Sequence, residues 1–541
     1  MKPLRLPLLL AALFVACTSA PPLAAPAPAS PPASPRIAAP ESAPPRWWLA
    51  PANAASPGAG VEAAYRELLA GKEPRRTVVV GVIDSGVDIA HEDLDGSLWV
   101  NPGEVAGNGV DDDGNGYVDD VHGWNFIGGA DGRNVADDTY EVTRLFAACR
   151  ALPAADERVV AGGVPCAEIE AVHAERRGDA EQMLAQVRGM GPAVERAYAV
   201  LRDELGRDSL TAEAVRAAVP MRLEVRQARQ IYLQLAAAGI TPAMIAAEEA
   251  RLERLLDRGL NPAFDPRPIV GDDYDDLRQR RYGNADVVGP DASHGTGVAG
   301  IIAAERGNGI GEDGIAPARI MVLRAVPDGD ERDKDVANAI RYAVDHGAHI
   351  INMSFGKGYS PGKRAVDEAV RYAEEKGVLL VHAAGNEGDD LATTPSFPTR
   401  RYDDGREAAN WIEVGASGWR APDALAAEFS NYGRDRVDVF APGVDITAAA
   451  PGNGSQTASG TSFAAPVVSG LAALIMAYYP ELSAADVRRV ILESARPYGT
   501  VMVTRPGSDG ERVPFGELSV TGGIVDARAA LELAEKVAAG K

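Results

Sequence analysis

From residue 76 onward, short apolar runs alternate with amphipathic segments. The apolar runs end in Gly, Ser, Asp or Asn, which is typical of strands buried on both faces of a parallel sheet; they are TVVVGVIDSG (77–86), RIMVLRAV (319–326), HIINMSFG (349–356), GVLLVHAAGN (377–386), NWIEVGAS (410–417) and VDVFAPG (437–443). A helical period recurs at residues 335–347, 364–377 and 483–495. This alternation predicts an α/β fold, a doubly wound and mostly parallel sheet with helices on both faces.

Residues 141–264 have a different pattern. Ala-, Glu- and Arg-rich segments with a helical period follow one another, and no strand-like run interrupts them. The last segment opens with Thr241 and Pro242, a pair that favours a helix start because Thr caps the helix and Pro fits its first position. We therefore expect an all-helical insertion, a hairpin or small bundle, within an α/β domain of residues 47–140 and 265–541.

The sequence predicts an export signal at the N-terminus. Basic residues, an apolar run and then Val-Ala before Cys17 are typical of a secretory signal over residues 1–17. The signal resembles that of bacterial lipoproteins, with Cys17 as the lipidated residue, although Phe14 stands where leucine is usual. A simple cleaved secretory peptide is the alternative. Residues 18–46, rich in Ala, Pro and Ser, suit a semi-extended tether.

Charge and cysteine content narrow the class of protein. The 541 residues carry a formal net charge of −23, which argues against nucleic acid or an anionic membrane surface as partner. We expect an exported protein that contacts the membrane only through a lipid on Cys17. Cys149 and Cys166 could form a disulfide in an oxidising compartment, and two free buried thiols are the alternative.

Four polar residues stand at the ends of predicted strands or the starts of predicted helices. Asp84 ends the first strand, Asn386 follows another, and His294 and Ser462 open apolar helices. Acyl transfer requires a serine nucleophile, an imidazole base, a carboxylate that orients the imidazole, and donors for the oxyanion, so each residue suits one role. Each also has an ordinary interpretation: a turn-forming Asp or Asn, a satisfied polar His, and a Ser helix cap.

The helix after the serine has a proline inside it. Pro466 favours a helix that begins at or near Ser462, because proline is tolerated in the first turn, where the backbone donors are unpaired. The positive end of the helix dipole would then point at an oxyanion formed beside the serine.

The strings DSGVD, HGTGVAG, AAGNEG and GTSFAAP resemble the four signature segments of the subtilases, the subtilisin-like serine endopeptidases. The resemblance covers residues 76–135 and about 285–535. It implies a subtilisin-like fold, protein or peptide substrates and no organic cofactor. It also implies the catalytic roles: Ser462 as nucleophile, His294 as general base, Asp84 as its orienting carboxylate, and Asn386 with the Ser462 N–H as oxyanion donors.

The same resemblance implies how substrate is held. The segment INMSFG corresponds to the edge on which a substrate strand pairs. Ser354, Phe355 and Gly356 would lie beside the P1 pocket, with Ala383, Ala384 and Gly385 opposite, and we expect tolerance for large apolar P1 residues. His382, predicted to be buried beside the Asn386 loop, is the other histidine of interest.

The acidic stretch GNGVDDDGNGYVDD is a candidate calcium loop. Oxygen ligands at alternate positions and a glycine for the turn resemble the first half of such a loop; the candidates are Asp111, Asp113, Asn115, the Tyr117 carbonyl, Asp119 and Asp120. We expect a structural calcium ion. A merely solvated acidic loop is the alternative.

The chain departs from the family pattern between Asp84 and His294. These residues are 294 − 84 = 210 positions apart, because the helical insertion lies between them. The insertion could be a lid, a substrate-selecting platform or an internal inhibitor. A catalytically silent scaffold that uses the insertion to bind a partner, and a peptidase dedicated to one partner protein, are the alternatives to a general endopeptidase.

Overall fold

The computed structural model describes residues 43–53, 56–153, 159–219, 222–422 and 424–541. The predicted signal, Cys17 and most of the predicted tether lie outside these residues. The described chain forms two compact units, a smaller one of residues 166–264 and a larger one made of the residues up to 165 and from 265 to 541.

The larger unit is built on a ten-stranded sheet in the order β11-β14-β8-β6-β5-β4-β1-β3-β2, with β7 paired to β6. The pairs from β2 through β14 are parallel, and only β7 and β11 pair antiparallel. The predicted mostly parallel sheet is thus confirmed. Its strands are β1 Val78–Asp84, β2 Gly123–Asn125, β3 Ala318–Arg324, β4 Ile350–Met353, β5 Leu379–Ala383, β6 Trp411–Arg420, β7 Ala424–Ala426, β8 Val439–Pro442, β11 Arg496–Pro497 and β14 Gly523–Ile524.

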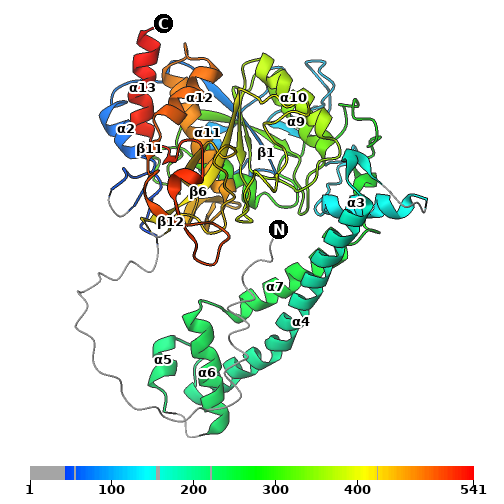
Figure 1. Cartoon of the computed structure of the whole chain (residues 1–541), viewed down its shortest axis with the longest axis vertical. Coiled ribbons are helices and arrows are strands. Elements are labelled where there is room, and N and C mark those ends of the chain that lie inside the picture. Colours follow the sequence, from blue (N-terminus) through cyan, green and yellow to red (C-terminus); the bar gives the residue numbers. More distant parts are fainter. Residues whose placement is uncertain (1–42, 54–55, 154–158, 220–221, 423) are drawn as a thin grey trace. The chain divides into compact units, whose positions relative to one another are not determined.

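Helices cover both faces of this sheet (Figure 1). Side chains alternate between faces along a strand, so in β1 Val80 and Val82 pack in the hydrophobic core on one face of the sheet while Ile83 packs in the core on the other face. The helices of this unit are α2 Val61–Glu67, α3 Glu141–Ala151, α8 Ser293–Ala303, α9 Asp333–Asp345, α10 Lys363–Glu375, α11 Thr461–Tyr478, α12 Ala484–Glu493 and α13 Ala527–Ala539. Two hairpins, β9 Ile446–Ala450 with β10 Gly454–Ala458 and β12 Met502–Thr504 with β13 Arg512–Pro514, complete the unit.

Helix α11 is the central core helix. Among the described helices it alone is long and apolar enough by itself to cross a membrane, yet 94% of that stretch is buried. The bent pair Leu223–Ala237 and Pro242–Gly259 passes the same test only if it is taken as one span. Because α11 packs against β1, β4, β5, β6 and β8, its first residues are held rigidly at the sheet edge.

The smaller unit consists of helices α4 Cys166–Leu205, α5 Ala212–Ala217, α6 Leu223–Ala237 and α7 Pro242–Arg254, with a π turn at Leu255–Gly259. Helix α4 packs against α6 and α7. Thr241 caps α7, its side chain accepting from the Met244 N–H, with Pro242 at the first position. Helix α3, which the sequence analysis placed in the insertion, belongs to the larger unit. Cys149 and Cys166 are disulfide-bonded.

Candidate active site

Asp84 and His294 form a hydrogen-bonded pair at the carboxyl-terminal edge of the sheet. Asp84 is the last residue of β1, and His294 is the second residue of α8. Asp84 Oδ1 accepts from His294 Nδ1 and from the Ser85 N–H, both at 2.8 Å. The Asp84 side chain is 3% exposed, whereas that of His294 is 37% exposed. The bond fixes the ring and leaves its Nε2 atom available to a reacting group.

Glycine makes this close approach feasible. A Cβ atom on Gly295 would lie 2.1 Å from the Gly86 carbonyl oxygen, so only glycine lets α8 approach the loop after β1. The edge of the Phe463 ring faces His294 with the ring centroids 5.5 Å apart. Since Phe463 follows Ser462, this contact places the start of α11 beside the histidine.

The surroundings of His294 set its protonation. Burial opposes the charged form, but the Asp84 carboxylate and its hydrogen bond outweigh that cost, so the pKa of His294 is raised above its ordinary value of 6.5. The imidazole can therefore act as a base only above that raised pKa, and the imidazolium that it forms is stabilised.

Ser462 is the second residue of α11, after Gly460 at the N-cap. Backbone N–H groups in a first turn have no intrahelical acceptor, and no oxygen of the described residues accepts from the Ser462 N–H. A Cβ atom on Gly460 would lie 2.9 Å from Ser462 Oγ and 3.7 Å from Asn386 Nδ2. The space between the hydroxyl and the amide is thus kept open by a glycine.

The prediction that the helix begins at or near Ser462 is confirmed, because α11 starts at Thr461, but Pro466 is its sixth residue and lies beyond the first turn. A residue at this position would normally donate to the Ser462 carbonyl, and proline cannot. The Ser354 hydroxyl donates to that carbonyl instead, at 2.8 Å. The proline is tolerated because a side chain from β4's end replaces the missing helix bond.

Ser354 is in turn held by a buried chain of hydrogen bonds. Ser469 donates to Asn352 Oδ1 at 2.8 Å, and Asn352 Nδ2 donates to Ser354 Oγ at 2.9 Å. All three side chains are buried. The sequence predicted Ser354 at the substrate edge, and its hydroxyl here supports helix α11 at Ser462. Nothing in the sequence indicated a role for Ser469 or Asn352, apart from each being a polar residue within an apolar run.

The Asn386 side chain has one orientation. Its Oδ1 atom accepts from the Thr461 N–H at 2.8 Å and from the Thr461 hydroxyl at 3.0 Å. Because an amide N–H can only donate, this assignment leaves Nδ2 as the donor next to Ser462. Nδ2 and the Ser462 N–H are thus two donors beside one hydroxyl, the arrangement that an oxyanion requires.

Asn431 holds the loop that carries Asn386. Its Nδ2 donates to the Ala384 carbonyl and to Glu387 Oε2, and its Oδ1 accepts from the N–H groups of Glu387 and Asp389. The side chain is buried, so all four bonds are intramolecular. No local sequence pattern points to Asn431, because it lies more than forty positions beyond the loop.

The predicted substrate edge lies next to these groups. The Phe355 carbonyl accepts from His382 Nε2 at 2.8 Å, and His382 Nδ1 faces Glu413 Oε1 at 2.8 Å. A Cβ atom on Gly356 would lie 2.6 Å from Ser396 Oγ, so the edge closely approaches the 396–397 segment. On the other side, Ala383 and Ala384 are buried, and Gly385 donates to the Thr461 hydroxyl.

A buried ion cluster fixes the residue after this edge. Lys357 Nζ contacts Glu141 Oε2 at 2.8 Å and Asp333 Oδ1 at 2.9 Å, with all three side chains at most 5% exposed. Burial disfavours the Glu141 carboxylate, but Arg144 and Lys357 outweigh it and lower the pKa of Glu141 to about 2. Buried charge pairs thereby tie helix α3 to the residue that follows the predicted substrate edge.

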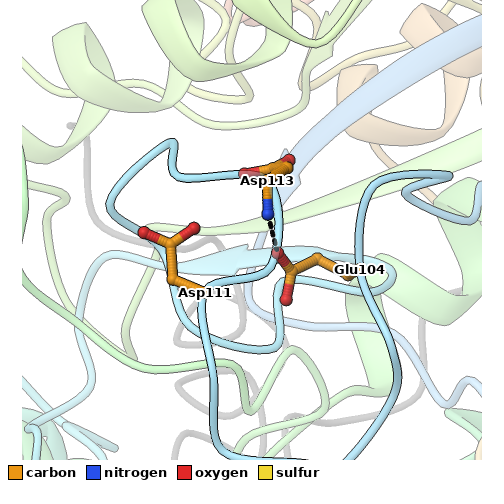
Figure 2. Close-up of side chains that lie close together, drawn as sticks. All are labelled: Glu104, Asp111 and Asp113. Carbon is orange, nitrogen blue, oxygen red and sulfur yellow. Dashed lines mark hydrogen bonds between the residues drawn. The ribbon is translucent and has the colours of Figure 1, made fainter.

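The acidic loop brings three carboxylates together. Oxygen atoms of Glu104, Asp111 and Asp113 all lie within 4.8 Å of one another (Figure 2). Calcium binds oxygen at about 2.3–2.6 Å, so two ligands of one ion lie at most about 5.2 Å apart, and this donor set fits. Glu104 was missed from the sequence because it precedes the Asp-rich stretch and reaches the cluster by folding.

The other predicted calcium ligands make different contacts. Asp120 is buried and accepts from Tyr342 and Asn101, while Asp119 accepts from the Asn108 and Gly109 N–H groups. Neither belongs to the carboxylate cluster found among the described residues.

Asn115 and Tyr117 also have other partners. The Asn115 side chain donates to Asp113 and Asp120, and its Oδ1 accepts from the Tyr117 N–H. The Tyr117 ring is buried against Trp124. Of the six predicted ligands, the structure therefore places Asp111 and Asp113 in the cluster.

Comparison with known proteins gives consistent matches. The subtilase family matches residues 75–516. The chain is 41% identical over 226 residues to a thermophilic serine proteinase of Bacillus sp. (strain AK1), covering 41% of this chain and 51% of that protein. It is 36% identical over 210 residues to subtilisin BL of Lederbergia lenta, covering 38% of this chain and 71% of that protein. The solved protease domain of PatA aligns at 32% identity with a TM-score of 0.36, over 46% of this chain and 82% of that domain. The chain spans about half the length of the first of these relatives.

Proposed function

The chain belongs to the subtilase family, and on that premise we propose that it is a serine endopeptidase that hydrolyses peptide bonds of exported proteins. Subtilases are serine endopeptidases. The observation that carries the proposal is the Asp84–His294 hydrogen bond beside the N-terminus of α11, where Ser462 lies. Protein and peptide chains are the substrates, and nothing favours nucleic acid as a partner.

In the proposed reaction, Ser462 Oγ attacks the peptide carbonyl carbon while His294 Nε2 accepts its proton. Asn386 Nδ2 and the Ser462 N–H donate to the oxyanion of the tetrahedral intermediate. His294 then delivers the proton to the leaving amine. In the second half of the reaction, water attacks the acyl-enzyme while His294 Nε2 accepts its proton, and His294 returns a proton to Ser462 Oγ as the acid product leaves. Asp84 keeps the imidazole in the tautomer that this sequence requires.

The substrate would bind as an extended strand along residues 354–356. Backbone pairing there provides affinity with little sequence preference, and the P1 side chain would lie between this edge and residues 383–385. We expect cleavage after large apolar residues. Sequencing the cleavage sites of the enzyme in a peptide library tests this, and a preference for charged P1 residues would contradict it.

A fluorophosphonate probe tests the proposed activity. Labelling of the chain made without residues 1–17 is expected, and it is lost in Ser462→Ala. Labelling that persists in Ser462→Ala would contradict the assignment. A folded chain that neither labels nor cleaves would instead favour a silent scaffold, and cleavage of a single partner protein would favour a dedicated processing peptidase.

We also propose a structural calcium ion held by Glu104, Asp111 and Asp113. Bound there, calcium supplies positive charge that relieves the repulsion between three carboxylates. Removal of calcium by a chelator is expected to lower the melting temperature, and Asp113→Asn should abolish the response. The matched control is Asp112→Asn, which changes the same charge in the same loop outside the cluster. An unchanged melting temperature on chelation would contradict the proposal.

The chain is further proposed to be exported and anchored by a lipid on Cys17, facing the periplasm or the cell exterior. The sequence of residues 1–17 and the Ala/Pro/Ser-rich tether support this. Cys17→Ser is expected to release the protein from the membrane fraction. Retention of that variant in the membrane would contradict a lipid anchor.

A further inference from the structure

A pocket of about 600 Å³ lies at the edge of the sheet opposite Asp84. It is lined by Thr77, which precedes β1, and by Ala318 and Arg319 at the start of β3. Because β1 and β3 are parallel, these residues share the amino-terminal edge, whereas Asp84 lies at the carboxyl-terminal edge. The pocket is therefore separate from the candidate active site.

The pocket is locally basic in an acidic protein. Its lining holds Arg75, Arg76, Arg306 and Arg319 against only two acidic residues, Glu73 and Glu305. The chain as a whole has a formal net charge of −23. Cations concentrated in one concavity of an acidic surface focus the field there and attract an anion.

Arg76 has no counter-ion among the described residues. Its Nε atom is buried without a hydrogen-bond partner, and burial, with no carboxylate to offset it, lowers the pKa of Arg76. The Nε atoms of four other arginines also have no hydrogen-bond partner, but each of those side chains has a carboxylate on a terminal nitrogen; they are Arg46, Arg144, Arg371 and Arg400. A partly buried guanidinium without a counter-ion costs free energy, and an incoming oxyanion would offset that cost.

The neighbouring arginines are positioned by other contacts. Arg306 lies over the Tyr65 ring, 4.1 Å from its centroid, and Arg75 pairs with Glu481 at 3.1 Å. Arg319 donates to the carbonyl of Gly96 and has no carboxylate partner among the described residues. Two guanidinium groups of one pocket thus lack a carboxylate partner among the described residues.

We propose that this pocket binds an oxyanion-bearing ligand, a phosphate or carboxylate group, between Arg76 and Arg319. The planar guanidinium suits both groups, because it donates two parallel hydrogen bonds to a pair of oxygens. The volume lies in the range of small-molecule sites, and Ala303, Ala304, Ala316 and Pro317 provide apolar lining for the rest of a ligand. The site does not depend on the proposed peptidase activity.

Calorimetry and thermal melting of the whole chain made without residues 1–17 test this site, with inorganic phosphate and citrate as probes. Chloride at matched ionic strength controls for screening. Saturable binding and a raised melting temperature are expected, with at least tenfold weaker binding in Arg76→Gln and in Arg319→Gln. Arg364→Gln, an exposed residue elsewhere with the same charge change, should bind like wild type. Arg319→Gln keeps the test valid if Arg76→Gln folds poorly, because Arg319 is exposed.

Vesicles of phosphatidylglycerol and phosphatidylcholine form the second arm. Vesicle binding that Arg76→Gln and Arg319→Gln abolish, without binding of the free anions, would identify a lipid headgroup as the source of the oxyanion and support the site. The absence of saturable binding to any of these probes, or binding that both variants leave unchanged, would overturn the proposal.

Discussion

Asn431→Ala is expected to weaken the proposed oxyanion hole, although Asn431 is not itself one of the proposed donors. The Asn431 amide makes four hydrogen bonds to the loop that carries Asn386, at 2.9, 2.8, 3.1 and 2.8 Å. Alanine removes all four and leaves the buried backbone groups of this loop without their partner. Asn386 would then no longer be held next to Ser462.

The magnitude follows from these contacts. Three neutral bonds at about 1 kcal/mol each and one bond to a carboxylate at about 2 kcal/mol give an upper limit near 5 kcal/mol, and water entering the site reduces it. We expect a loss of about 3 kcal/mol in the free energy of unfolding. A side-chain oxyanion donor contributes about 10²–10³ in rate, so partial misplacement should slow acylation about 10–100-fold.

The assay is the rate constant for fluorophosphonate labelling in a double-mutant cycle. If Asn431 acts through Asn386, the variant that carries both alanines should label as slowly as Asn386→Ala alone. The control is Asn338→Ala, which removes a buried amide of the same size from α9 and should reduce stability but not labelling. Losses that multiply in the double variant would refute the reasoning.

Three further outcomes follow from the site. The rate of labelling should rise with pH as His294 loses its proton, with a pKa above 6.5. Asp84→Asn should move this rise to lower pH and slow labelling about 10⁴-fold. A pH dependence that Asp84→Asn leaves unchanged would argue against the Asp84–His294 pair. Ser354→Ala should leave the Ser462 carbonyl without its donor and cost about 1–3 kcal/mol in unfolding measured by urea; full stability would contradict the role of that bond. The ionised Glu141 carboxylate stabilises the fold, so its contribution to the free energy of unfolding is present above pH 4.5 and is lost as pH falls toward about 2. Acid unfolding of Glu141→Gln should lack this pH-dependent loss of stability, and an acid transition identical to that of the wild type would contradict the prediction.

The sheet could be predicted from the sequence because its strands are buried on both faces. Each predicted apolar run overlaps one observed strand, namely β1, β3, β4, β5, β6 and β8, and Asp84 ends its strand as expected. Thr241 and Pro242 open α7 because capping is a local property of a few residues. The gathering of Asp84 and His294 followed from parallel topology, which places strand ends at one edge.

The remaining features depended on contacts between distant residues. Helix α4 continues through Pro192, a residue type that ordinarily interrupts a helix. Buried residues on both sides of this proline pack against α6 and α7, and this packing outweighs the lost backbone bond. Glu104 joined the carboxylate cluster, and Ser354 reached the Ser462 carbonyl, through folding that no local pattern encodes.

The chain of bonds from Ser469 through Asn352 to Ser354 has a consequence for how variants of this protein are interpreted. Ser469→Ala changes side-chain volume little and lies in an apolar helix, so a scale based on packing would rank it as neutral. It would nevertheless remove the donor from Asn352 and loosen the support of Ser462, seven positions away. Substitutions deep in the core should therefore be able to inactivate the protein. Ser469, Asn352 and Ser354 should accept substitution only when the three side chains change together.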